Sequence, residues 1–132
     1  MTFNQLFECT LNENVNYVCK ASAVRLEDEL IRKDFVNIRL FSKFNDNWHP
    51  TKVGICISLR NFERIAPLLE SLRPFVIGED NEVIEFARAP YATYLYEIQY
   101  KKWNGKQQSV NITENEIRKL FEVKDQLISS FN

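Results

Sequence analysis

The chain has 132 residues, 45% of them hydrophobic and 13% aromatic, with only three glycines and four prolines. This composition is typical of one folded globular domain or two very small ones, and it excludes a disordered or fibrous chain. The formal net charge of −1 argues against a uniformly basic nucleic-acid-binding domain. The positive charge is concentrated, however, because residues 35–57 carry +2 and residues 88–108 carry +3, whereas residues 75–87 carry −4.

Targeting signals are not expected in this sequence. No apolar run approaches the roughly 18 residues that a membrane-spanning helix needs. The first residues, MTFNQLFECTLNENVN, lack the cationic start and apolar block of a secretion signal. The cysteines at positions 9, 19 and 56 are odd in number and scattered, which indicates reduced thiols in an intracellular protein.

The first two segments alternate in the manner of strands. Residues 2–11 alternate around Phe7 and Cys9, residues 12–14 form a turn, and residues 15–26 alternate again. Placing Cys9 opposite Tyr17 and Phe7 opposite Cys19 gives a consistent antiparallel hairpin. Residues 27–34 are expected to be a charged connector, with one helical turn as an alternative.

The stretch from Phe35 to Ile65 organises the chain. Residues 35–44 sort with period two into an aliphatic face and a face with basic and aromatic side chains. A polar turn follows, and residues 52–57 return with the same alternation. Pairing Lys43 with Lys52 places Phe41 opposite Gly54 and Arg39 opposite Cys56. A basic face with interleaved rings is suited to an unpaired nucleic-acid strand, because cations neutralise phosphates and rings stack on bases.

A helix is predicted directly after this hairpin. Ser58 is a plausible N-cap, and apolar residues follow at helical spacing from Phe62 to Leu72. Pro67 lies inside this run, so the helix should kink near Glu63 or split into two short pieces.

The second half repeats the first. Strands are predicted at residues 75–77, 82–88, 91–100 and 106–112, with a turn at Asn104-Gly105. Thr113 and Glu116 form a capping box at the start of a helix that runs to the C-terminus.

The two halves align without a gap at an offset of 55 residues. Trp48 then matches Trp103, Phe41 matches Tyr96, and Ser58 matches Thr113. The predicted fold is therefore α+β: two tandem β-β-β-β-α units, residues 1–73 and 74–132, with antiparallel sheets and packed helices. Each unit is too small to cover its own apolar face, so we expect an intramolecular pseudo-dimer with one core.

The central hairpin also resembles a known family. Ile38-Arg39, followed by PTKVGICISLRNF at residues 50–62, is similar to the core of the positive cofactor four proteins, which are single-stranded-DNA-binding transcriptional coactivators. The tandem layout is similar to that of the Whirly single-stranded-DNA-binding proteins. The resemblance implies a non-enzymatic protein of transcription or replication, located in the nucleus or nucleoid. Its implied partners are single-stranded DNA or RNA, transcription or replication proteins, and a further copy in a homo-oligomer, with no membrane.

The predicted nucleic-acid-binding residues are basic and aromatic side chains of the two hairpins and of a neighbouring strand. They are Lys20, Arg39, Phe41, Lys43, Trp48, Lys52, Tyr94, Tyr96, Lys101, Lys102, Trp103 and Lys106. The orientation of the second set stays open. The offset of 55 places Tyr94 and Tyr96 on the binding side, whereas hydrophobic periodicity places them inside.

No catalytic, cofactor or metal site is predicted. The sequence has a single histidine, His49, and no Cys/His spacing typical of a metal site. It also lacks the phosphate-loop, nucleophile-elbow and zinc-protease motifs. The alternative function is a protein-interaction module that kept the fold without DNA binding, favoured by the near-neutral charge, by Val53 in place of a basic residue, and by the acidic segment 75–87.

Overall fold

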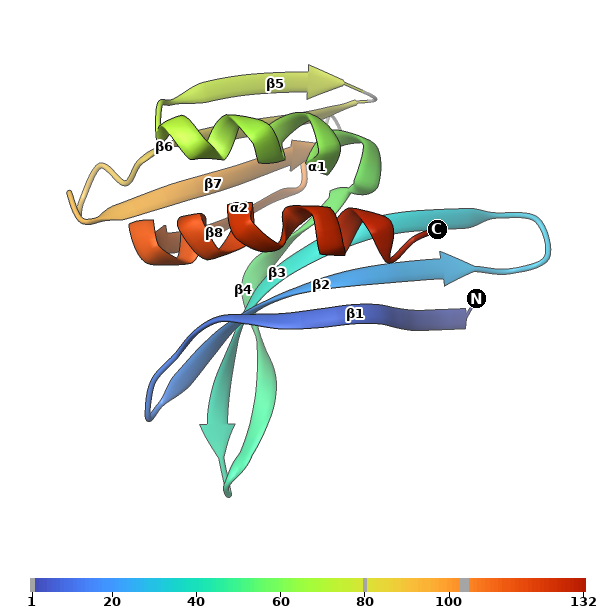
Figure 1. The fold of residues 1–132 in the computed structure, drawn as a ribbon, viewed down its shortest axis with the longest axis horizontal. Helices are drawn as coiled ribbons and strands as arrows, with labels where there is room; N and C mark the ends of the chain where they lie inside the picture. Colours follow the sequence, from blue (N-terminus) through green and yellow to red (C-terminus); the bar gives the residue numbers. More distant parts are fainter. Residues whose placement is uncertain (1, 80, 103–104) are drawn as a thin grey trace.

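The computed structural model describes residues 2–79, 81–102 and 105–132. In these residues two antiparallel four-stranded sheets are each followed by a helix (Figure 1), which confirms the α+β class and the repeated order of elements. Sheet 1 comprises β1 (Thr2–Glu13), β2 (Tyr17–Glu27), β3 (Arg32–Phe44) and β4 (Asn47–Ser58), followed by α1 (Leu59–Ile65) and the 3-10 helix η1 (Ala66–Ser71). Sheet 2 comprises β5 (Phe75–Glu79), β6 (Glu82–Arg88), β7 (Leu95–Lys102) and β8 (Gln107–Thr113), followed by α2 (Glu114–Ser129).

Both helices begin as the sequence predicts. The Ser58 hydroxyl accepts the backbone N–H of Asn61, and the full capping box of Thr113 and Glu116 is present. Pro67 splits the first helical run, because α1 ends at Ile65 and a 3-10 helix with a proline in its first turn continues to Ser71. In the described residues no helix is long and apolar enough to cross a membrane.

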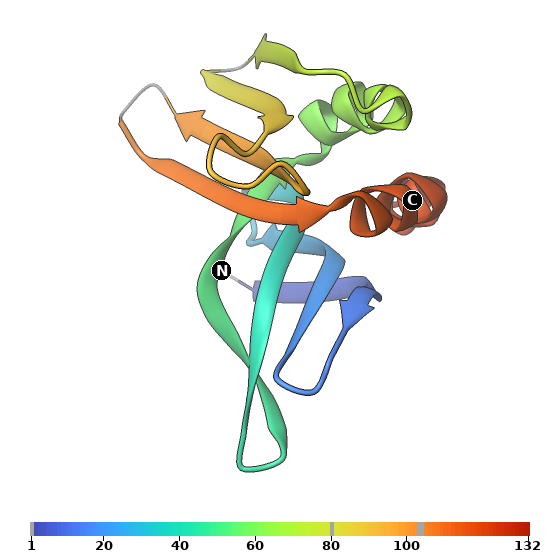
Figure 2. The same ribbon diagram turned by 90° about the vertical axis from the view of Figure 1, so that its left-hand side faces the viewer.

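The core lies between the helices and one face of each sheet. Figure 2 shows the helices together on one side, so the opposite faces of both sheets are turned away from them. These are called the outer faces below. Helix α2 packs against β1 and β2 of sheet 1 as well as against η1, and its apolar side chains join one cluster with both sheets. The Arg25 side chain fixes the end of the chain by donating to the Phe131 carbonyl at 2.7 Å.

The predicted register of the first hairpin is wrong, but the predicted side chains do share one face of the sheet. Cys9 lies opposite Ala21 rather than Tyr17, and Phe7 lies opposite Ala23 rather than Cys19. The connector that follows is not helical. It is a tight turn in which Asp28 Oδ1 accepts the N–H groups of Leu30 and Ile31, so the strands extend further into the charged segment than predicted.

The central hairpin keeps its predicted faces where it packs against the helices and changes its register, whereas Phe44 and Val53, predicted on the aliphatic face, are exposed. Val36, Ile38, Ile55 and Ile57 are fully buried against the helices. Arg39 lies opposite Gly54 rather than Cys56, and Lys43 lies opposite Trp48 rather than Lys52. The cause is a bulge in β4 between Pro50 and Gly54, together with a tight turn at Asn45-Asp46, where both residues have positive φ.

The structure shows which side of β7 faces the core, and the result agrees with the hydrophobic periodicity rather than with the repeat. Tyr96, Ile98 and Tyr100 are buried, so the alignment of Tyr96 with Phe41 at an offset of 55 is wrong. Val36 pairs with Ile57, whereas Tyr96 pairs with Ile112, so the first hairpin is five residues longer than the second. The offset of 55 therefore holds for β4, β8 and the two N-caps, but not for the strands that precede them.

Candidate nucleic-acid interface

The outer face of sheet 1 brings together the basic and aromatic residues predicted on different strands. Lys20 on β2 lies directly opposite Arg39 on β3, and Val18 lies opposite Phe41. The Lys20 ammonium is 5.0 Å from the centre of the Phe41 ring and 3.2 Å from a carboxylate oxygen of Glu8 on β1. Strand pairing thus assembles a cation and a ring on one surface, with one acidic neighbour.

Gly54 determines how Arg39 lies on this face. A Cβ atom at position 54 would come within 2.9 Å of the Arg39 Cζ and 2.8 Å of the Ile38 carbonyl oxygen. The missing side chain therefore lets the guanidinium lie across β4, where its Nη1 donates to the Thr51 carbonyl at 2.8 Å. A guanidinium has five N–H donors, so this single contact leaves others for a ligand.

The far end of the same hairpin carries more of the predicted residues. The Lys43 ammonium lies 5.7 Å from the Trp48 ring, which is half-buried. Lys52 is exposed in the bulge of β4, where the Thr51 hydroxyl donates to the Leu40 carbonyl at 2.7 Å. In Figure 1 this hairpin extends beyond the layer of helices, so its end is accessible from several sides.

A depression of about 380 Å³ lies at the centre of the outer face of sheet 1. Its lining residues come from all four strands: Phe3, Gln5, Ser22, Val24, Asn37, Arg39, Phe41, Pro50 and Cys56. Aromatic rings thus lie beside polar groups, with Phe3 exposing 64% of its surface. The size is within the range of small-molecule sites, and the lining combines stacking surfaces with a few polar groups, as is usual for such sites.

The depression continues toward the seam between the sheets. At the seam, β4 meets β8, and the Cys56 N–H donates to Gln108 Oε1 at 3.3 Å. A second depression of about 210 Å³ there includes Cys56, Lys102 and Lys106. A third depression, of about 600 Å³, has charges of both signs in its lining: Lys33, Arg60 and Lys102 together with Asp34, Glu63 and Glu82.

The thiol of Cys56 lies among the charges of both sheets. Burial raises its pKa, and the charges of Arg39 and Lys102 act in the opposite direction. Arg39 lines the central depression together with Cys56, and Lys102 lines the depression at the seam together with Cys56, although the two cations belong to different sheets. Lysine and arginine side chains thus lie from β2 across the outer face of sheet 1 to the seam, where Glu82 is an acidic neighbour of Lys102.

The remaining predicted residues lie elsewhere. Tyr96 is a core residue whose ring stacks on Phe86 at 5.4 Å, so its prediction as a binding residue is wrong. Tyr94 is 74% exposed but lies in the loop before β7. Lys101 lies opposite Val83 on the outer face of sheet 2. Trp103, the counterpart of Trp48, lies outside the described residues.

Sequence reasoning missed several residues of the central depression. Ser22 and Asn37 are paired neighbours on β2 and β3, and alternation within each strand places Ser22 on the face of Lys20 and Asn37 on the face of Arg39. Phe3 reaches the outer face because a bulge near Leu6 exchanges the two faces of β1. No local pattern predicts that bulge, so only the fold could place Phe3 beside Phe41.

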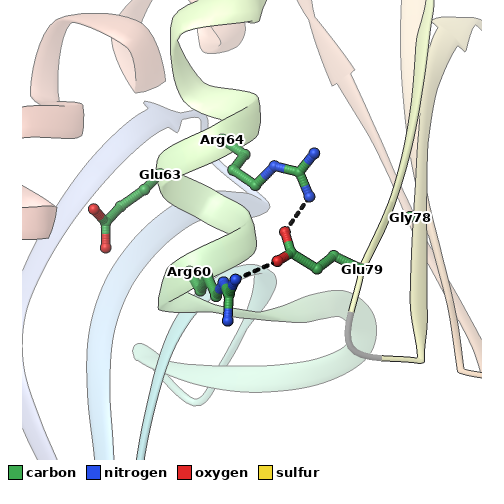
Figure 3. Close-up of a pocket in the computed structure, with 5 residues that line it drawn as sticks. All are labelled: Arg60, Glu63, Arg64, Gly78 and Glu79. Atoms are coloured by element: carbon green, nitrogen blue, oxygen red, sulfur yellow. Dashed lines mark hydrogen bonds and ion pairs between the residues drawn. The ribbon is translucent and has the colours of Figure 1, made fainter.

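A further depression beside α1 is less suited to bind an anion. It is lined by Arg60, Glu63, Arg64, Gly78 and Glu79. Figure 3 shows both arginine side chains directed at the Glu79 carboxylate, which Arg60 contacts at 2.5 Å and Arg64 contacts as well. This carboxylate offsets the positive charge that a phosphate would require. In the described parts of the chain no group of three or more His, Cys, Asp or Glu side chains could hold a metal ion.

No protein-family model matches this sequence, and no curated protein does. Among solved structures the chain is similar to one described as crystal structures of Trypanosoma bruciei MRP1/MRP2, with 13% sequence identity and a TM-score of 0.47. That similarity covers 92% of this chain and 82% of the other.

Proposed function

We propose that the chain is a non-enzymatic protein that binds single-stranded nucleic acid through the outer face of sheet 1. The observation that carries the proposal is the convergence of Lys20, Arg39 and Phe41 beside a depression that shares Cys56 with a second depression lined by Lys102. Single-stranded DNA is the proposed ligand, with RNA as the alternative. The resemblance of the central hairpin to positive cofactor four proteins supports a role beside transcription or replication proteins, in the nucleus or nucleoid.

An unpaired strand fits this surface for physical reasons. Its phosphates would be neutralised by lysine and arginine side chains, with release of counterions. Its bases have no partners and would stack on Phe41, Trp48 and Phe3. A duplex presents no free base faces to these rings, so it should bind more weakly.

The proposal includes an internal pseudo-dimer. Both units place an N-capped helix directly after their fourth strand, and the apolar faces of the two units join in one core. In this interpretation the second unit covers the apolar face of the first, as a second subunit would in a dimer of a one-unit protein. The two outer faces have diverged, because sheet 2 carries Glu85 and Glu97 on the same side as Lys101.

The first test is a gel shift with labelled 20-nucleotide single strands of DNA and RNA and the matching duplex at low salt. We expect a shift of the single strands that weakens as salt rises, and a weaker shift of the duplex. Absence of binding to every probe at low salt would contradict the proposal.

The alternative of a protein-interaction module is favoured by one feature of sheet 2. Strand β5 lies at its edge, with Val76 67% exposed, and the neighbouring outer face is acidic. Such an edge could add a strand from a partner. Retention of a protein partner together with no retention on immobilised single strands would support this second function.

A further inference from the structure

We propose that the central depression of sheet 1 is a guanine-binding pocket, in which Asn37 and Arg39 contact complementary edges of one base. This inference rests on the proposed function, because the guanine is taken to belong to a bound single strand. It goes further by assigning a base preference to a surface that would otherwise be indifferent to sequence.

The Asn37 side chain provides an unpaired acceptor among the residues that line the depression. Its Oδ1 is inaccessible to water and has no hydrogen-bond partner among the described residues. Leaving such an acceptor unpaired is unfavourable for the folded protein. Asn37 also lines the depression, and the torsion about its Cβ–Cγ bond is broad, so in this proposal the amide rotates to present its carbonyl to the ligand. A ligand with N–H donors would then pair with a carbonyl that has no partner among the described residues.

Arg39 provides the opposite chemistry two residues along the same strand. It lines the same depression, and one of its N–H groups is fixed on the Thr51 carbonyl above Gly54. Residues two apart on a strand point to the same side and are separated by about 6.6 Å. The remaining Arg39 donors and the Asn37 amide therefore line one depression from neighbouring positions on the same side of β3.

Guanine is the base that matches this pair. Its O6 and N7 are acceptors, for which arginine is the commonest specific partner. Its N1–H and N2 amino groups are donors, which Asn37 Oδ1 would accept. Adenine offers N7 but places an amino donor where guanine has O6, so it would confront the Arg39 donors. Phe41 and Phe3 line the same depression and provide surfaces on which the ring can stack.

The test uses thymine-rich 12-mers of single-stranded DNA that contain one guanine, adenine, inosine or 7-deazaguanine at the same position. We expect the guanine strand to bind at least about fivefold more tightly than the adenine strand. Inosine, which lacks the N2 amino group, and 7-deazaguanine, which lacks N7, should each lose part of this preference.

Variants separate recognition from folding. Asn37→Leu removes the acceptor and also removes the unpaired buried group, so the guanine preference should vanish while the melting temperature stays equal or rises. A structural role would instead lower the melting temperature. Asn111→Leu, on an exposed site of β8, is the matched control and should keep the preference.

The outcomes distinguish the pocket from the proposed function. Tight binding of all four strands with equal affinity would overturn the guanine pocket and leave the strand-binding function intact. No binding of any strand would overturn the proposed function. In that case guanosine monophosphate is the second probe. Saturable binding that is lost in Asn37→Leu would retain the pocket as a nucleotide site, and absence of guanosine monophosphate binding would overturn the pocket as well.

Discussion

Phe41 lies on the outer face of β3, where its ring contacts the Lys20 ammonium instead of the core. Phe41→Ala should weaken binding of a single strand by about 1–3 kcal/mol, because it removes a stacking surface. The dependence of affinity on salt should stay unchanged, because no charge is removed. Fluorescence anisotropy at several salt concentrations measures both quantities.

Circular dichroism provides the control for this variant. Val36 and Ile38, on the opposite side of β3, fill the core, so the fold of Phe41→Ala should remain intact. If the variant unfolds, the ring is a core residue and the assignment of faces is wrong.

At the scale of elements, the central hairpin depends on the absence of a side chain at Gly54. Gly54→Ala would place a Cβ within 3 Å of the Ile38 carbonyl and the Arg39 guanidinium. We expect a loss of about 1–3 kcal/mol in the free energy of unfolding from overpacking, and weaker nucleic-acid binding because Arg39 is displaced. Urea denaturation and anisotropy measure these effects.

Gly78→Ala is a matched control, because a Cβ there would meet its nearest neighbour only at 3.7 Å. It should change stability little. Equal behaviour of the two alanine variants would contradict the role assigned to Gly54.

The sequence predicts those features of the elements that depend on local chemistry. The caps at Ser58 and Thr113, the break at Pro67 and the aliphatic face of β3 follow from side chains a few residues apart. The register of β3 with β4 does not follow, because a bulge in β4 and a two-residue turn with positive φ decide it. The facing of Tyr96 could not be chosen from the sequence, since the repeat and the periodicity led to opposite answers.

In the candidate site, too, the sequence predicts what depends on one strand and not what depends on the pairing of several strands. Arg39 and Phe41 are predictable because they alternate with buried residues on one strand. Their neighbours Lys20, Ser22 and Lys102 come from other strands, and Phe3 depends on a bulge. Such neighbours are determined by strand pairing across the whole sheet, which one sequence alone does not specify.

At the scale of the whole molecule, the two units depend on each other through α2. This helix packs on β1 and β2, although it follows β8 in the chain. A fragment of residues 1–73 loses that cover, so Ala21, Ala23 and their apolar neighbours become exposed. We expect the fragment to dimerise or aggregate in size-exclusion chromatography with light scattering, and a stable monomer would argue against the pseudo-dimer.

Stability should also fall at high pH. Burial raises the pKa of the thiols of Cys9, Cys19 and Cys56, and burial and the Glu82 carboxylate raise the pKa of Tyr100. The unfolded chain therefore releases these protons at lower pH than the folded protein does. Their contribution to stability is complete below about pH 8 and decreases as the pH rises above it.

Urea midpoints at about pH 7 and about pH 9.5, on either side of the ordinary thiol pKa, measure this effect, and the midpoint should be lower at the higher pH. Cys19→Ala removes a thiol whose pKa is strongly raised, so the decrease between the two pH values should be smaller in that variant. A midpoint that rises with pH would contradict the assignment.

The salt dependence of single-strand binding tests the central claim most directly. The slope of log affinity against log salt should be negative for the natural protein. It should become less steep by roughly 0.7 for each phosphate interaction that Lys43→Ala or Lys52→Ala removes. The control is Arg118→Ala on the solvent-exposed side of α2, where Arg118 pairs with Glu114. This variant removes one positive charge away from the proposed binding surface, so the slope should stay unchanged. If the lysine double variant keeps both the affinity and the slope, or if no strand binds at low salt, the outer face of sheet 1 is not the binding surface.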